Sequence, residues 1–216
     1  MITRELANKV LKELAISMYE YCVNDKKLDE KEATNLAMRL YNHSLVVGAI
    51  AEKIAEKSGL DVEKSYIFGL LHDIGRFKPE RFHGIVGYEI AMDNNNPELA
   101  RICLTHVFLS DKKIREEEFP NNDFKKDDIE KTKNILSKIE YNDYDLLIRL
   151  CDFMSIGDTI YSSTIDDRIL DLKKRYNIAE NDCEKLRSEL YKIKDYFDEK
   201  IGGDLYELLE IKSCIK

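Results

Sequence analysis

The sequence has few of the residues that interrupt helices. It contains three prolines and nine glycines in 216 residues, and it has no tryptophan. Apolar residues recur at intervals of three and four along most of the chain, whereas strand-like alternation never extends beyond a few residues. We therefore predict an all-α fold, and the length suits one sizeable hydrophobic core.

Long apolar segments and clusters of positive charge are also missing. No run of 18 or more apolar residues occurs, and no basic-then-apolar leader follows Met1. We therefore expect a soluble, cytoplasmic protein with no membrane partner. The formal net charge is −8 without a basic run, which argues against nucleic acid as a partner, although a small basic pocket remains compatible with it.

The cysteines show no pattern of a structural zinc site or of a disulfide framework. None of the five forms a CxxC pair, and Cys103 and Cys151 lie within apolar stripes. We expect these two side chains to be buried thiols that pack as small hydrophobic groups.

The apolar periodicity and the turn residues divide the chain into helices. Residues 142–155 are apolar on nearly every face, which predicts a central helix, and Pro97 suits the first position of a helix. The polar segment 110–126 is the best candidate for a mobile loop or lid. The expected helices span about 2–23, 29–58, 61–73, 82–91, 97–106, 127–139, 142–155, 164–177, 181–197 and 205–211.

The most informative segment is LHDIGR at 71–76, where an apolar helix runs into a histidine and an aspartate. Neighbouring helical residues do not share a face, but His72 and Asp73 can converge if the helix ends there. We expect Gly75 to end it in the left-handed conformation. The alternative interpretation is an ordinary polar pair at a helix C-terminus.

Three further residues are anomalous in their surroundings. His43 and His106 occupy apolar stripes, and Asp152 lies inside an apolar helix, where an unpaired carboxylate costs several kcal/mol. The histidines could be core residues with hydrogen-bond partners. Asp152 could pair with Arg149 or Arg39, or with a metal cation.

Together with His83, these residues could bind one or two divalent cations. Imidazole-rich ligation suits Mn, Fe, Co, Ni or Zn, although one site could hold Mg. Two cations about 3.5–4 Å apart are a common means of activating water against phosphorus. The ligands of a first cation would be His43, His72, Asp73 and Asp152. The ligands of a second would be Asp73, as a bridge, with His83 and His106.

The order of these motifs resembles the HD-domain superfamily of metal-dependent phosphohydrolases. The matching elements are His43, LHDIGR at 71–76, HGIVG at 83–87, TH at 105–106 and LCD at 150–152. The resemblance implies an all-α, HD-type helical bundle with at least five core helices and six ligands around two metals. We expect a single domain over 1–216, with an HD core over 29–160 and a C-terminal helical extension over 161–216.

The resemblance implies hydrolysis of a phosphate ester or anhydride by a metal-activated water. The expected substrate is a phosphorylated small molecule similar to a nucleotide. Asp73 could serve as both ligand and proton acceptor, and Arg76 follows it closely enough to take part in catalysis. Arg76, Lys78 and Arg81 could bind the substrate phosphate. They could equally form a solvated basic loop.

Other activities remain open at this point. No Gly-Tyr-Pro follows His106, so the cyclic-dinucleotide phosphodiesterase branch is not indicated. The superfamily also contains di-iron oxygenases that use the same six ligands. A third reading is a non-catalytic module that binds a nucleotide or a partner, and the C-terminal helices also leave a homodimer open.

Overall fold

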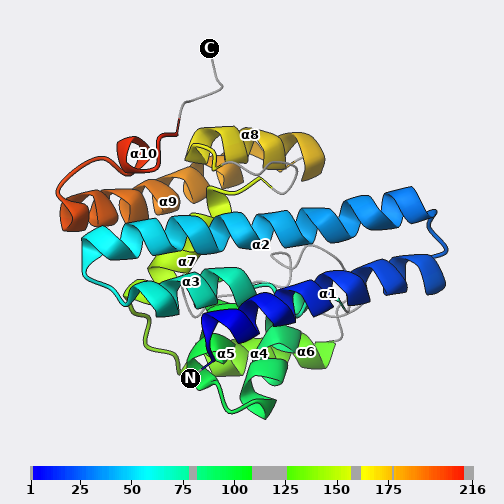
Figure 1. Cartoon of the computed structure of the whole chain (residues 1–216). Helices are drawn as coiled ribbons and strands as arrows, with labels where there is room; N and C mark the ends of the chain where they lie inside the picture. Colours follow the sequence, from blue (N-terminus) through cyan, green and yellow to red (C-terminus); the bar gives the residue numbers. More distant parts are fainter. Residues whose placement is uncertain (1, 78–81, 109–125, 157–161, 177, 212–216) are drawn as a thin grey trace.

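The computed structural model describes residues 2–77, 82–108, 126–156, 162–176 and 178–211, and these residues form helices joined by short connections (Figure 1). The predicted all-α fold is confirmed, and no β-strand occurs among the described residues. An isolated antiparallel bridge joins Ser155 to Ser162. The helices are α1 (Arg4–Asn24), α2 (Glu30–Ser58), α3 (Val62–Leu71), α4 (His83–Asp93), α5 (Pro97–Thr105), α6 (Lys126–Leu136), α7 (Asp143–Phe153), α8 (Ile165–Tyr176), α9 (Glu180–Ile201) and α10 (Leu205–Leu208).

Side-chain caps fix where several helices begin. The carboxylate of Asp29 accepts a hydrogen bond from the backbone of the third residue of α2, and Asp61 does the same for α3. Asn142 and Asp145 form a reciprocal capping box at the start of α7. Pro97 is the first residue of α5, as predicted.

The long helix α2 crosses the middle of the molecule (Figure 1). In that view α1 and α3 lie below it, and α8 and α9 lie above it. One hydrophobic cluster includes Leu11 of α1, Val47 of α2, Leu147 of α7 and Phe197 of α9. The C-terminal helices therefore pack on the same apolar core as α2 and α7. The division into an HD core and an extension remains our interpretation.

Glycines allow two close contacts that position the elements near the centre. A Cβ atom on Gly69 would lie 2.8 Å from the Cα atom of Gly48, so only glycine allows α3 to approach α2 this closely. A Cβ atom on Gly75 would lie 2.0 Å from the carbonyl oxygen of His83. Gly75 is therefore needed for contact with the start of α4.

The expectation that Gly75 ends a helix in the left-handed conformation is wrong. Among the described glycines, positive φ angles occur at Gly59 and Gly202. The helix ends at Leu71, and His72 keeps right-handed angles of φ −55° and ψ −31°. Tight turns then carry the chain through Gly75.

Three further expectations concern the cysteines, membrane-spanning helices and the predicted lid. The four described cysteines are buried free thiols, including Cys103 and Cys151 as predicted. No described helix combines the length and apolarity that a membrane span requires. The predicted lid at 110–126 falls, apart from its last residue, outside the described residues.

Candidate metal centre

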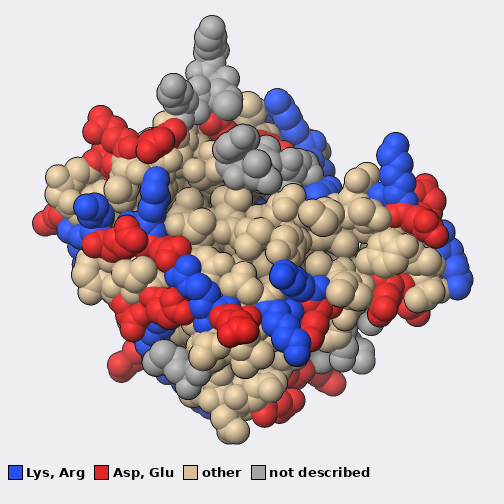
Figure 2. Space-filling model, in the orientation of Figure 1, with Lys and Arg blue, Asp and Glu red and all other residues tan. Residues whose placement is uncertain are grey.

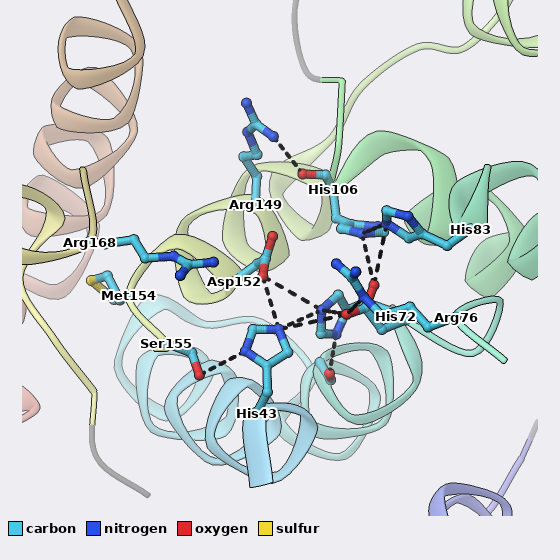
Figure 3. Close-up of polar contacts among 12 residues, drawn as sticks. His43, His72, Arg76, His83, His106, Arg149, Asp152, Met154, Ser155 and Arg168 are labelled. Carbon is cyan, nitrogen blue, oxygen red and sulfur yellow. Dashed lines mark hydrogen bonds and ion pairs between the residues drawn. The ribbon is translucent and has the colours of Figure 1, made fainter. Parts of the chain in front are cut away.

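Five helices bring the six predicted ligands to one point beneath the molecular surface (Figure 3). Most are nearly inaccessible, and Asp73 and His106 are each 1% exposed. The contributing positions are His43 in α2, His72 and Asp73 directly after α3, His83 as the first residue of α4, His106 directly after α5, and Asp152 in the last turn of α7.

The first set of ligand atoms gathers around the Nε2 atom of His43. This atom lies 3.0 Å from Asp152 Oδ1 and 3.3 Å from His72 Nε2. Asp73 Oδ2 completes the set at 3.8 Å from His43 Nε2 and 3.5 Å from His72 Nε2. Two imidazoles and two carboxylates thus surround one small volume.

The second set gathers around the other oxygen of Asp73. Asp73 Oδ1 lies 3.4 Å from Nε2 of His83 and 3.4 Å from Nε2 of His106. The two ring nitrogens are 3.3 Å from each other. The carboxylate of Asp73 therefore presents one oxygen to each set.

Outer hydrogen bonds determine which ring nitrogen faces inward. The Nδ1 atom of His72 lies 2.7 Å from the carbonyl oxygen of Gly69, and that of His106 lies 3.1 Å from the carbonyl of Ile102. A carbonyl only accepts, so each Nδ1 must carry the hydrogen. In the neutral rings Nε2 then points a lone pair into the centre, as a metal-binding imidazole does.

This arrangement leaves acceptors facing acceptors. The lone pair of His106 Nε2 faces Asp73 Oδ1, which is buried and has no hydrogen-bond partner. A buried acceptor without a donor costs about 1–3 kcal/mol. A divalent cation would satisfy the carboxylate oxygen and both facing imidazoles at once, so the donor set fits one on each side of Asp73.

The carboxylates are held in their charged forms. Burial favours neutral Asp73, but the guanidinium of Arg76 and the ring of His72 outweigh burial and hold the pKa of Asp73 well below its usual range. Burial likewise opposes charge at Asp152, and its contacts with His43 and His72 hold that pKa well below normal. Both groups are therefore anionic at neutral pH and could serve as metal ligands.

The imidazoles differ in their protonation. Burial, together with the charge of Arg76, holds the pKa of His83 well below its usual value, and burial lowers the pKa of His106. At His72 burial is outweighed by Asp73 and other nearby carboxylate charge, which raise its pKa. His83 and His106 are thus free to coordinate at neutral pH, whereas a proton competes with a cation at His72.

Of the three predicted phosphate-binding residues, the structure describes only Arg76. Its Nε atom pairs with Asp73 Oδ2, and its side chain is 44% exposed. A half-exposed guanidinium beside the ligands can reach a bound substrate. Lys78 and Arg81 lie outside the described residues.

One of the two alternative partners considered for Asp152, Arg149, does not pair with it in the structure. Arg149 donates instead to the carbonyl oxygens of His106 and Val107, at 2.8 and 2.6 Å, and to Glu189. Arg149 thus supports the segment that carries His106. In the sequence, Arg149 precedes Asp152 by three residues, which places the two side chains on one face of the helix and made them a plausible ion pair.

Sequence reasoning missed Ser155. Its hydroxyl lies 3.0 Å from Nδ1 of His43 and orients that ring from outside the centre. Only its position just beyond Asp152 could have indicated this role, and serine occurs too widely for that to be a signal. Such outer contacts matter because they fix the direction of the ligand's lone pair.

Curated relatives match parts of the chain. Ribonuclease Y from Mycoplasma capricolum is 36% identical over 77 residues, which are 34% of this chain and 15% of that protein. Ribonuclease Y from Thermosipho melanesiensis is 41% identical over 63 residues, 28% of this chain and 12% of that protein. Ribonuclease Y from Geobacter sulfurreducens is 28% identical over 96 residues, 43% of this chain and 17% of that protein.

The chain thus spans less than a fifth of the length of these relatives. No solved structure gives a significant match. The family model of the HD domain matches residues 40–155, which is more than half of the chain and includes every candidate ligand. This chain therefore belongs to the HD domain family.

Proposed function

We propose that this chain is a metal-dependent phosphohydrolase that cleaves a phosphate ester or anhydride of a small, nucleotide-like substrate. The observation that carries the proposal is the bridging position of Asp73, whose two oxygens face different sets of imidazoles. Two bound divalent cations would lower the pKa of a water molecule and take up charge from the phosphoryl oxygens. We propose Mn, Fe, Co, Ni or Zn, with Mg possible at one position.

The chain's own residues would hold and orient the reactants. His43, His72 and Asp152 fix the first position, and His83 and His106 fix the second, with Asp73 shared between them. Asp73 would act as the shared anionic ligand rather than as a strong base, because its pKa is held well below the usual range. Arg76 would bind a phosphoryl oxygen, because its planar guanidinium donates to two oxygens at once.

A second candidate is cleavage of RNA, which the name of the relatives favours. RNA is a phosphodiester polymer, so the same centre could attack it. However, the chain carries a net charge of −8. Basic and acidic side chains are also interspersed over the face seen in Figure 2, whereas RNA binding calls for a basic surface. We therefore prefer a small substrate.

The test is a substrate panel with defined metal content. Protein purified without a chelating tag is analysed for bound metals, stripped, and reloaded with Mn, Co, Ni, Zn or Mg. Nucleotides, p-nitrophenyl phosphate, bis(p-nitrophenyl) phosphate and a labelled RNA are then compared by kcat/KM. Asp73→Asn serves as the inactive control.

We expect a metal-loaded sample to hydrolyse small phosphate compounds under anaerobic conditions, and the chelated sample and the control to be inert. Preferential cleavage of RNA would favour the second candidate. Oxygen consumption by an iron-loaded sample, with no hydrolysis, would instead indicate an oxygenase. Metal-loaded protein that is inert throughout the panel would contradict the proposal.

A further inference from the structure

After Asp152 the chain folds back beside the candidate metal centre. The backbone N–H of Ser163 donates to the carbonyl of Met154 at 2.7 Å, and an isolated bridge pairs Ser155 with Ser162. These contacts fix the start of α8 next to the last turn of α7. The C-terminal helices therefore supply one wall beside the ligands.

Arg168 extends from this wall. In Figure 3 its guanidinium comes from α8 and points toward Asp152, past Met154. The side chain is 17% exposed, and one of its terminal nitrogens, Nη1, donates to Asp171 at 2.8 Å. Its Nε atom is buried and has no hydrogen-bond partner. A buried donor without an acceptor is costly, which suggests that an acceptor is missing.

Arg149 of α7 provides a comparison with Arg168. It donates through Nη1 to two carbonyl oxygens and through Nε and Nη2 to Glu189. Each of its nitrogens has a partner within the protein. Arg168 lacks this saturation, although both side chains are largely buried.

Two guanidinium groups thus flank the ligands. Figure 3 shows Arg76 and Arg168 on opposite sides of Asp152, the first beside Asp73 and the second on α8. Opposed guanidinium groups are well suited to bind a phosphate with several charged oxygens.

We propose that Arg168 binds a phosphate group of the substrate, so that the C-terminal helices contribute to substrate recognition. This inference rests on the proposed function, because it assigns a residue for recognition of the same substrate. It also predicts that the site binds inorganic phosphate through Arg168.

The structure supplies a matched control. Arg175 lies on the same helix, is exposed, and donates through Nε to Asp171 at 2.7 Å, so it shares the carboxylate partner of Arg168. Substituting either arginine removes one ion pair with Asp171. Helix α8 should persist in both variants, because Asp166 accepts hydrogen bonds from Arg187 and Tyr191 of α9.

The experiment compares wild type, Arg168→Ala, Arg168→Lys and Arg175→Ala, each loaded with Mn²⁺. Calorimetric titration with inorganic phosphate gives the affinity, and hydrolysis of p-nitrophenyl phosphate gives kcat and KM. We expect Arg168→Ala to weaken phosphate binding and raise KM at least about tenfold, since a charged hydrogen bond contributes about 1.5–3 kcal/mol. Arg168→Lys should recover part of the affinity, and Arg175→Ala should match wild type.

The results can overturn the assignment of Arg168 and the proposed function separately. Equal phosphate affinities in Arg168→Ala and Arg175→Ala would overturn the assignment, as would a loss of bound Mn²⁺ or of melting temperature confined to Arg168→Ala. Wild type that binds no phosphate would also overturn it. Wild type that binds phosphate through Arg168 but hydrolyses nothing would retain the assignment and overturn the proposed function.

Discussion

Two buried carboxylates in this molecule have opposite surroundings. Asp145 of α7 is fully buried and accepts hydrogen bonds from Nε of Arg101 at 3.1 Å, from the hydroxyl of Thr105 at 2.7 Å and from the backbone N–H of Asn142 at 2.7 Å. Asp73 is equally buried, but its Oδ1 atom faces imidazole nitrogens and has no donor.

The contrast separates a residue that stabilises the fold from one that serves a site. Around Asp145 every contact pairs a donor with an acceptor, so the protein alone satisfies the charge. Around Asp73 the lone pair of His106 is turned inward by its outer hydrogen bond to a carbonyl. That arrangement becomes favourable only when a cation joins it. We therefore expect Asp145 to matter for stability and Asp73 for metal binding.

The largest expected effect comes from Asp73→Asn. An amide cannot serve as an anionic bridge, so both cations should be lost, and kcat/KM should fall more than about a hundredfold, because metal Lewis acidity contributes several kcal/mol. The amide also loses the ion pair with Arg76, so the free energy of unfolding of the metal-free protein should fall as well, because the low pKa of Asp73 shows that its charged form stabilises the fold. Elemental analysis and urea unfolding measure both. If Asp73→Asn retained two cations, Asp73 would not differ from Asp145 in its importance for metal binding.

His83→Ala should remove one of the two bound cations, which is half of the loss expected for Asp73→Asn. The substitution removes a ligand that faces only Asp73 Oδ1 and His106, so one cation equivalent should be lost and one retained. His43→Ala is the matched variant for the other set. Titration with Mn²⁺ counts the equivalents. If His83→Ala binds as many cations as wild type, the second set holds none.

Asp145→Asn should lower the stability of the protein and leave its metal binding unchanged. It weakens charged hydrogen bonds from Arg101, Thr105 and the start of α7, and we expect the free energy of unfolding to fall by about 2–3 kcal/mol. Bound metal per folded chain should stay as in wild type. Urea unfolding of the metal-free protein is the measurement, and an unchanged midpoint would show that a fully paired carboxylate is not stabilising here.

Ser155→Ala should produce the smallest effect. It removes the hydroxyl beside Nδ1 of His43 and leaves every ligand in place. Loss of such an outer contact typically costs about tenfold or more in metal affinity. Competition with a fluorescent chelator would measure the change at the first position. An unchanged affinity would mean that packing alone orients His43.

Much of the fold followed from local sequence signals. Apolar periodicity, the capping residue Asp29 and the first-turn residue Pro97 act within a few residues, so they predicted the helices to within a few positions of their bounds. The role of Gly75 was misread for a related reason. Its necessity comes from His83, a residue of another helix, and no local pattern records that contact.

The candidate ligands could be predicted from the sequence, whereas some of the residues around them could not. Three candidate ligands, His43, His106 and Asp152, could be identified because they are anomalous on apolar helix faces, whereas His72, Asp73 and His83 were identified from the order of the motifs. Ser155 and Arg168 carry no such anomaly, since serine and arginine are common near helix ends. Their relevance depends on where the chain returns after α7, which is a property of the tertiary structure.

Anomalous diffraction from crystals grown with Mn²⁺ tests most directly whether Asp73 bridges two cations. We predict two anomalous peaks per chain, one on each side of the Asp73 carboxylate, the first beside His43 and Asp152 and the second beside His83 and His106. A single peak, or peaks located away from Asp73, would contradict the claim.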